Sequence, residues 1–483
     1  MTAMTATLIR GGWVLTAATP RPAASGAGTA DGAATPAVVR HGAVLIADGV
    51  VQAVGTFAEL SAAHPEARVH GGPNDIVTPG FVNTHGHFSE GLITGIASQY
   101  TLWEWISALI NPVSPHLDRE MAYTGTLLAG MQMLQSGITT ANDMFVTDPG
   151  IREPITPGVV EALDELNLRG VVSFGAGDMG STRGIDAEFD EHEALREAAA
   201  ASRLSTFRVG IGAVGGQSDA MFERSIELAV NGVGGGGHGT DAGPAGFGVH
   251  IHLQEIREEV TATMQRKGLT AIGYSEKAGL FEAPTLAAHC VWLDRADRDI
   301  LARNRVGVAH NPVSNMILAS GVAPVAELRQ LGVDVGIGVD GPASNDSQDM
   351  MQAVKSAALL ARVHHQQATA MSAEEAFELA TIGGARALRM QDTIGSLEPG
   401  KAADLIVFDG DAPALANVHD PFQAIVFAAG ARDIASVWVD GRPSVMAGEV
   451  VTVDARDTVE RSRPLARRLV RAAGLGHLSE LAR

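Results

Sequence analysis

Short apolar runs alternate with longer segments of helical periodicity along the middle of this chain. The segment 119–134, for example, repeats its apolar residues on one side, which predicts an amphipathic helix. Alternation of strands with helices over roughly ~250 residues is typical of an α/β protein with a (β/α)8 TIM barrel. The eight strands that this pattern predicts are 76–83, 138–145, 169–177, 207–214, 247–253, 285–290, 306–310 and 334–339.

Strands are also predicted on both sides of the barrel. The N-terminal ones lie within 5–16 and 43–54, and the C-terminal ones follow the turn at 395–404 and recur near 423–428 and 434–440. The C-terminal strands lack a core of their own, so we expect them to join the N-terminal strands. The result is a small β-sandwich domain built from both chain ends.

These patterns divide the chain into four parts. We expect residues 1–75 to form the N-terminal part of the small β domain and 394–450 its C-terminal part. The barrel occupies 76–393, with helices at 349–366 and 372–388, and 451–483 is a C-terminal helical tail. Two segments fall outside these elements. The segment 18–36, rich in Ala, Gly, Thr and Pro, is a surface insertion or a disordered loop, and the glycine-rich 232–248 is a surface loop or a lid.

Charge and cysteine content narrow the partners. Among 483 residues, 35 Lys and Arg face 55 Asp and Glu, a formal charge of −20. Such a surface repels nucleic acid and anionic membranes, and favours a neutral or cationic small-molecule substrate. The single cysteine, Cys290, excludes an intramolecular disulfide, and we find neither a signal-peptide pattern nor an apolar run of membrane-spanning length. We expect a cytoplasmic homodimer or higher homo-oligomer.

A metal centre is predicted at one rim of the barrel. His85 and His87 are two residues apart at the end of the first predicted strand, so both side chains point to the same face. The carboxyl ends of barrel strands share one rim. Imidazole and carboxylate groups there suit zinc, and also iron, cobalt or manganese. The metal-compatible residues at the ends of strands one, five, six and eight are His85, His87, His252, His289 and Asp340.

The neighbouring residues supply candidate acid–base groups. Glu255, three residues after His252, is the candidate general base for a metal-activated water. Its alternative is a solvated loop carboxylate, as we expect for Glu258 and Glu259. His289 is either a further ligand or a group that polarises the substrate oxygen.

Two further histidines accompany this set. His250 shares a face with His252 and either supports the ligands or has a structural role. His310 ends strand seven and is expected to line the pocket. The first lysine of the chain is Lys267, so no lysine from strand four can bridge two metals, and we expect one divalent metal ion per chain.

Several runs together resemble the amidohydrolase superfamily, in particular the branch of S-adenosylhomocysteine and methylthioadenosine deaminases and of atrazine and triazine hydrolases. The resemblance implies that His85, His87, His252 and Asp340 bind the metal and that Asp340 helps to activate the water. It also implies that Glu255 shuttles protons and that His289 steadies the substrate or the tetrahedral intermediate. The matching runs are 79–87, 252–255, 287–291, 310–315, 338–345 and 400–405.

The substrate side departs from the nucleoside deaminases. Trp105 matches an aromatic residue that flanks the purine in that group, and we expect Trp105, Phe174 and His310 to contact the substrate. Four positions carry apolar or shorter side chains where those deaminases have polar ones, and a buried ribose hydroxyl left without a partner loses about 1–3 kcal/mol. These positions are Ser114, Phe174, Val214 and Ile317.

We therefore expect a metal-dependent hydrolase of a C–N bond in a small, neutral, fairly apolar molecule. Substituted ureas, carbamates, thiocarbamates and amides fit, as in phenylurea- or molinate-type hydrolases of this superfamily. The first alternative is a deaminase of an N-heterocycle, such as an s-triazine, pterin, purine or adenosine-type nucleoside. The second is an inactive scaffold like the dihydropyrimidinase-related proteins, against which the intact ligand set and Glu255 argue.

Overall fold

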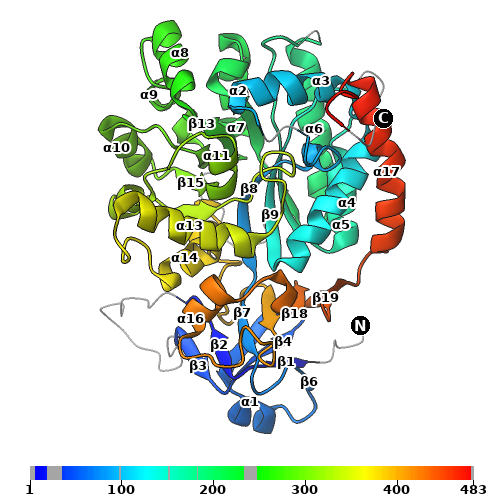
Figure 1. Cartoon of the computed structure of the whole chain (residues 1–483), viewed down its shortest axis with the longest axis vertical. Helices are drawn as coiled ribbons and strands as arrows, with labels where there is room; N and C mark the ends of the chain where they lie inside the picture. Colours follow the sequence, from blue (N-terminus) through cyan, green and yellow to red (C-terminus); the bar gives the residue numbers. More distant parts are fainter. Residues whose placement is uncertain are drawn as a thin grey trace.

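The computed structural model describes residues 6–18, 35–96, 99–150, 153–181, 183–232 and 247–479. Figure 1 shows a large α/β body above a smaller β body, and the smaller body contains segments from both ends of the chain. The interior of the expected insertion at 18–36 and of the glycine-rich loop at 232–248 lies outside the described residues.

The large body contains the predicted ring of parallel strands in two sheets. One sheet has the order β11-β10-β9-β8 and the other β12-β13-β14-β15-β16. The ladder is not continuous around the ring. At one junction Gly212 N donates to Ala176 O (3.3 Å), and at the other Asp340 N donates to His85 O (3.0 Å). The strands are β8 (Phe81–Gly86), β9 (Ile138–Phe145), β10 (Arg169–Phe174), β11 (Ser205–Phe207), β12 (Val209–Ala213), β13 (Val249–Leu253), β14 (Thr285–His289), β15 (Gly307–His310) and β16 (Val335–Ile337).

The first predicted strand, 76–83, is in fact two strands in two different sheets. β7 (Ile76–Pro79) pairs antiparallel with β17 (Leu405–Phe408) in the small body, and the first barrel strand begins at Phe81. Gly80 connects β7 to the first barrel strand. A Cβ at this position would lie 2.0 Å from Thr139 Oγ1, so only glycine fits. The expected domain boundary before residue 76 therefore comes one strand too early.

The small body consists of two sheets around a shared core. Their strand orders are β5-β4-β1-β6 and β20-β19-β18-β17-β7-β2-β3. Ile9 and Val44 from the first sheet are buried together with Leu405 and Trp438 from the second. The remaining elements are β1 (Thr7–Arg10), β2 (Trp13–Leu15), β3 (Val38–Arg40), β4 (Gly42–Ala47), β5 (Val50–Thr56), α1 (Phe57–Ala63), β6 (Arg68–His70), β18 (Ile434–Val439), β19 (Arg442–Met446) and β20 (Glu449–Val450).

The predicted strand near 423–428 is wrong, because this segment is helical. It forms α16 (Pro421–Gln423) and a π-helical turn, Ala424–Ala428. Asp420 accepts a hydrogen bond from Gln423 N (3.1 Å), and Pro421 occupies the first helical position. Both are helix-start signals that outweigh a short apolar run, which is compatible with either element.

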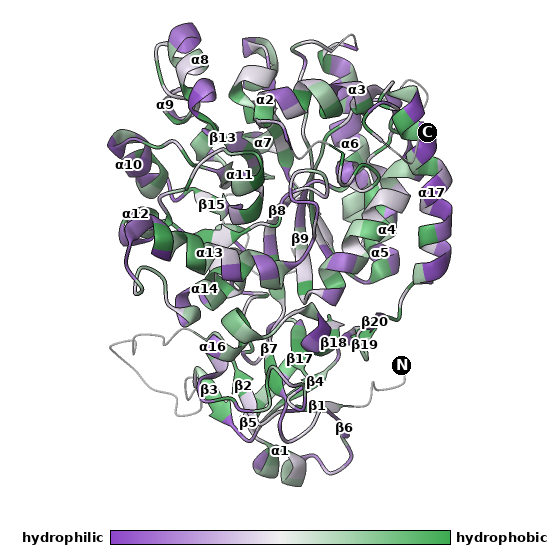
Figure 2. Ribbon diagram, viewed as in Figure 1, coloured by the Kyte–Doolittle hydropathy of each residue, from purple (hydrophilic) through white to green (hydrophobic). Residues whose placement is uncertain are grey.

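Helices cover the outside of the barrel, and most of them carry both hydrophobic and hydrophilic residues (Figure 2). The helix predicted at 372–388 breaks at Thr381, and the predicted tail forms α17, which packs beside α4 (Figure 1). No described helix is both long and apolar enough to cross a membrane. The helices are α2 (Leu102–Trp105), α3 (Asn111–Val113), α4 (Arg119–Gln135), α5 (Pro157–Leu166), α6 (Ile185–Ala201), α7 (Asp219–Asn231), α8 (Arg257–Lys267), α9 (Ala271–Lys277), α10 (Arg295–Arg303), α11 (Pro312–Ile317), α12 (Val325–Gln330), α13 (Met350–His365), α14 (Ala373–Ala380), α15 (Ile382–Ala387) and α17 (Ala455–Ala472).

Candidate active site

Four predicted ligands meet at the carboxyl ends of β8, β13 and β16. His85 ends β8 with His87 just beyond it, His252 lies in β13, and Asp340 follows β16. The Nε2 atoms of His87 and His252 are 3.2 Å apart. Asp340 Oδ1 lies 3.4 Å from His85 Nε2 and 3.5 Å from His87 Nε2. His85, His87 and His252 are close enough together to share one metal ion, and His85, His289 and Asp340 form a second such group. The four predicted ligands therefore gather around His85, and we refer to them as the cluster.

Backbone carbonyls fix two of the rings. His87 Nδ1 lies 2.7 Å from Met144 O, and His252 Nδ1 lies 2.5 Å from Gly212 O. A carbonyl oxygen only accepts, so we assign the proton of each ring to Nδ1. The Nε2 lone pairs then face the cluster, as metal-binding histidines require.

A chain of side chains orients the third ring. His85 Nδ1 lies 2.8 Å from His250 Nε2, and His250 Nδ1 lies 3.1 Å from Ser173 Oγ, which donates to Asp143 O at 2.7 Å. One set of proton positions satisfies this chain and leaves His85 Nε2 unprotonated. Burial lowers the pKa of His85 to about 4 and that of His250 well below its ordinary value, so both rings are neutral. Of its two predicted roles, His250 has that of a support for the ligands.

The donor set fits a divalent metal such as zinc. Adjacent ligands about 2.0–2.2 Å from a zinc ion lie roughly 3–3.5 Å apart, and three pairs of donor atoms here lie 3.2, 3.4 and 3.5 Å apart. In addition, His85 Nε2 is buried and accepts no hydrogen bond from the described residues. Buried polar atoms without partners are rare, and a metal ion would use this lone pair.

Glu255 and His289 lie beside the cluster, as predicted. His289 Nδ1 lies 2.9 Å from Asn315 Oδ1, and His289 Nε2 is 3.4 Å from Glu255 Oε2 and 3.8 Å from Asp340 Oδ2. Burial raises the pKa of Glu255, although His289 opposes this. Burial also acts to lower the pKa of His289, but the carboxylates of Glu255 and Asp340 outweigh it and raise that pKa overall. The two groups, 3.4 Å apart, are close enough for a proton to pass between them.

Three residues that sequence reasoning missed hold Glu255 in place. Gln254 is in the left-handed region (φ 54°), and Glu259 accepts hydrogen bonds from Gln254 N (3.1 Å) and Glu255 N (3.0 Å). Ser320 Oγ donates to Glu255 Oε1 at 2.8 Å. The prediction that Glu259 is a solvated carboxylate is wrong: burial raises its pKa to about 7. Its position in the first turn of α8, four residues after Glu255, was the available signal.

The three predicted substrate contacts lie in different surroundings. Trp105 is buried, and its Nε1 donates to Ala343 O (3.2 Å) in the loop that follows Asp340. The Phe174 ring instead packs edge-to-face on His192 of α6, with 5.4 Å between ring centroids. His310 lines a small cavity against α12 and α13. The structure does not bring Phe174 or His310 to the cluster, because both side chains point from their strands toward the outer helices.

Glu90 is a further buried carboxyl that sequence reasoning missed. It lies on the 3₁₀ turn Phe88–Glu90, directly after the His-x-His run. Its Oε2 accepts a hydrogen bond from Ala343 N at 2.9 Å. Burial, followed by the charge of Asp340, raises the pKa of Glu90 well above its ordinary value. Its position directly after the His-x-His run was the signal in the sequence.

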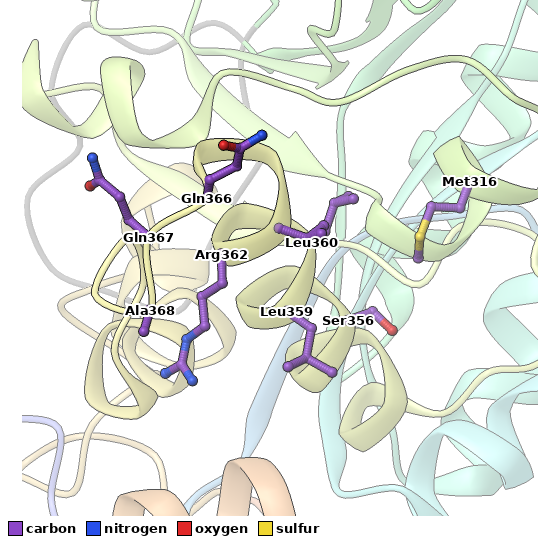
Figure 3. A pocket seen from close by; sticks show the side chains of 9 residues that line it. Met316, Ser356, Leu359, Leu360, Arg362, Gln366, Gln367 and Ala368 are labelled. Atoms are coloured by element: carbon purple, nitrogen blue, oxygen red, sulfur yellow. The ribbon is translucent and has the colours of Figure 1, made fainter.

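A surface hollow lies away from the cluster. It is an apolar groove of about 630 Å³ along α13, lined by Leu359 and Leu360, with Met316 on one side of them and Gln366 on the other (Figure 3). Leu359 is 47% and Val363 71% exposed. None of the metal-compatible residues lines this groove, so it is separate from the cluster.

Parallel β/α strands whose carboxyl ends present three imidazoles, a carboxylate and a buried acid define a metal-dependent hydrolase. Comparison with known proteins agrees with this class. The model of the amidohydrolase family matches residues 76–443, and a bacterial imidazolonepropionase-like composite domain matches 42–67. The chain belongs to the amidohydrolase family, which confirms the resemblance found in the sequence.

Individual relatives cover nearly the whole chain. A 5-methylthioadenosine/S-adenosylhomocysteine deaminase of Pelotomaculum thermopropionicum is 35% identical over 90% of this chain and 95% of its own. A 5'-deoxyadenosine deaminase of Methanothermobacter thermautotrophicus is 34% identical over 89% and 95%.

Solved structures agree in fold. A zinc-bound adenosine deaminase of Xanthomonas campestris has a TM-score of 0.82 at 27% identity, covering 96% of this chain and 98% of its own. An atrazine chlorohydrolase of Arthrobacter aurescens has a TM-score of 0.80 at 22% identity, covering 95% and 100%. The fold is that of the TIM-barrel amidohydrolases, and the chain is a hydrolase of non-peptide C–N bonds. The inactive-scaffold alternative is therefore wrong.

Proposed function

We propose that the protein is a zinc-dependent deaminase of an amino-substituted purine, with 5'-substituted adenosines as the leading substrate class. The observation that carries the proposal is the similarity to adenosine-type deaminases, 35% and 34% identical along about nine-tenths of the chain. It favours the deaminase alternative over the expected hydrolysis of small ureas, carbamates or amides.

The placement of Phe174 removes part of the argument against nucleosides. Its ring packs on α6, so its apolar character does not lower the polarity of the substrate pocket. Ser114, Val214 and Ile317 keep their apolar or short side chains. The ribose hydroxyls would therefore need partners other than those of the resembling deaminases.

The chain's own residues suffice for the proton transfers of a deamination. A divalent metal held by His85, His87, His252 and Asp340 would lower the pKa of a water molecule toward neutrality. The oxygen of that water forms a bond to the ring carbon that bears the amine. Glu255 takes one proton from the water and passes it to the adjacent ring nitrogen as the C–O bond forms. It then moves the second proton from that oxygen to the nitrogen that leaves.

His289 completes the reaction chemistry. Its Nε2 lies 3.4 Å from Glu255 Oε2 and, when protonated, can donate to the oxygen as negative charge develops there. The C–N bond breaks, ammonia leaves, and the ring carbon becomes a carbonyl. No step needs an oxidant or a reductant.

A substrate panel tests the proposal. Methylthioadenosine, S-adenosylhomocysteine and 5'-deoxyadenosine would be compared with an amino-s-triazine, a pterin, a phenylurea and a thiocarbamate, with released ammonia or amine as the readout and product identity from mass spectrometry. The proposal expects the highest kcat/KM with an adenosine and a product in which oxygen replaces the amine. A higher kcat/KM with the phenylurea or the thiocarbamate would overturn it.

A further inference from the structure

The turn that follows Asp340 is held by the segment that follows the first barrel strand. This turn comprises residues 341–344, and we refer to it as the Asp340 turn. Two elements of that segment hold it, the 3₁₀ turn Phe88–Glu90 and α2, which ends at Trp105. Glu90 and Trp105 each form a hydrogen bond to the same residue of the Asp340 turn. One bonds to its backbone N–H and the other to its backbone carbonyl.

That residue is Ala343, whose two backbone polar atoms are both bonded. Ala343 N donates to Glu90 Oε2 at 2.9 Å, and Ala343 O accepts from Trp105 Nε1 at 3.2 Å. Both partners are buried, Glu90 at 3% and Trp105 at 6% exposure. Buried bonds of this kind are costly to lose, because the remaining partner stays unsatisfied.

The carboxyl of Glu90 also packs against the start of the turn. A Cβ on Gly341 would lie 1.9 Å from Glu90 Oε2, so the fit requires glycine at this position. Ser344 Oγ lies 3.5 Å from the same carboxyl oxygen. Glu90 therefore touches the Asp340 turn at Gly341, Ala343 and Ser344.

The Asp340 turn also fixes the position of the Asp340 side chain. Gly341 N donates to Asp340 Oδ1 at 2.8 Å and also to Ser344 Oγ at 3.0 Å. Asp340 itself has a φ of 61°, a strained conformation for a residue with a side chain. Its Oδ1 is the atom that lies 3.4 Å from His85 Nε2 and 3.5 Å from His87 Nε2.

We propose that Glu90 and Trp105 are positioning residues that hold the Asp340 turn in place. They thereby orient Asp340 Oδ1 toward the metal site formed with the histidine ligands. The indole of Trp105 then has a structural task besides any contact with a flat substrate. The metal-affinity part of this inference is independent of the substrate, whereas the turnover part rests on the proposed function.

Two conservative variants separate this positioning role from bulk packing. Trp105→Phe keeps an aromatic ring and removes only the N–H donor. Glu90→Gln keeps a carbonyl oxygen for Ala343 N, whereas Glu90→Ala removes the acceptor. Loss of a residue that orients a metal ligand typically costs 10–100-fold in metal affinity or activity. We expect that loss for Trp105→Phe and Glu90→Ala, and recovery of most of it in Glu90→Gln.

The chain offers matched controls away from the cluster. Glu191 is also buried and accepts hydrogen bonds from Ile155 N (2.9 Å) and Thr156 N (2.7 Å). Trp438, in the small β body, donates from Nε1 to Ser436 Oγ at 3.1 Å. Glu191→Ala and Trp438→Phe remove the same kinds of bond without touching the Asp340 turn, so we expect a lower Tm with unchanged metal affinity.

The experiment measures zinc affinity by chelator competition, Tm, and kcat and KM at saturating zinc for the whole protein and each variant. The inference expects weaker zinc binding and lower kcat, with a smaller change in KM, in Glu90→Ala and Trp105→Phe alone. The double variant Glu90→Ala/Trp105→Phe should lose less than the product of the two single effects, because both act on one turn.

Two results would overturn the inference. One is zinc affinity in Glu90→Ala and Trp105→Phe equal to that of the controls. The other is a change confined to KM in Trp105→Phe, which would leave the indole a substrate contact only. If the wild type deaminates no adenosine, the proposed function fails, but zinc affinity still decides the positioning role.

Discussion

Replacing Glu255 by Gln tests the assignment of the proton shuttle. Glutamine keeps the size of the side chain, and its Oε1 can still accept from Ser320 Oγ, as Glu255 does at 2.8 Å. It cannot take a proton from water. We therefore expect Glu255→Gln to fold and to retain its metal while it loses most of its activity.

The structure narrows the expected size of that loss. General-base catalysis contributes about 10²–10⁴-fold, or roughly 2.7–5.5 kcal/mol of activation free energy. Asp340 Oδ2 is a second carboxylate oxygen, 3.8 Å from His289 Nε2, against 3.4 Å for Glu255 Oε2. It can take over part of the proton transfer, so we expect a fall in kcat near the middle of the range, about 10³-fold.

Steady-state kinetics on the best substrate of the panel, together with elemental analysis of the same preparation, provides the assay. Glu258→Gln, an exposed position in the first turn of α8, is the matched control and should retain wild-type kcat. A metal-loaded Glu255→Gln with kcat within tenfold of wild type would refute the assignment. Loss of the metal would show instead that Glu255 is a ligand.

Three further predictions concern metal content, pH and the contact between the two bodies. Elemental analysis should find one metal ion per chain, because no lysine precedes Lys267; two ions at full activity would contradict this. Burial raises the pKa of Glu188 from 4.5 to about 8, so its contribution to stability is complete below pH 4.5 and is lost as pH rises through 8. The Glu188→Gln variant should not show this loss of stability, which in the wild type amounts to at most roughly 4–5 kcal/mol of unfolding free energy. Equal pH profiles of chemical denaturation for the two proteins would contradict this prediction. Arg169→Met leaves the buried carboxylate of Asp404, now 3.0 Å from Arg169 Nε, without its charged partner, which should destabilise the fold by about 3–5 kcal/mol; an unchanged denaturation midpoint would exclude this role.

The sequence predicts the strand–helix alternation and the ligand set because both depend on local spacing. His85 and His87 share a face through the two-residue period of a strand, and each ligand lies at a strand end. Phe174 shows where this reasoning stops. One position along a strand reverses the direction of a side chain, so its neighbour Ser173 faces the cluster and Phe174 the outer helix.

The supports of the site depend on contacts that spacing does not encode. Glu90 bonds to Ala343, far along the chain, and no periodicity links the two. In the sequence, Glu259 cannot be distinguished from other acidic residues in the first turn of a helix. In the structure, the left-handed conformation of Gln254 directs the backbone N–H groups of Gln254 and Glu255 toward the Glu259 carboxylate. Such contacts form only in the complete tertiary fold. They cannot be recognised from the local pattern of a single sequence.

The antiparallel pair of β7 and β17 constrains how the chain is made. Val77 pairs with Val407, so β7 leaves the ribosome long before its partner strand β17. The edge of β7 that faces β17 therefore stays unpaired while the whole barrel is synthesised. Exposed edges recruit other strands, which makes a chain that stops before Leu405 prone to aggregate. A chain produced without the segment from Leu405 onward would meet the same difficulty, because β7 continues directly into the strand that carries His85. We therefore expect chains that lack the last strands to aggregate more readily, although these strands contribute no residue to the chemistry.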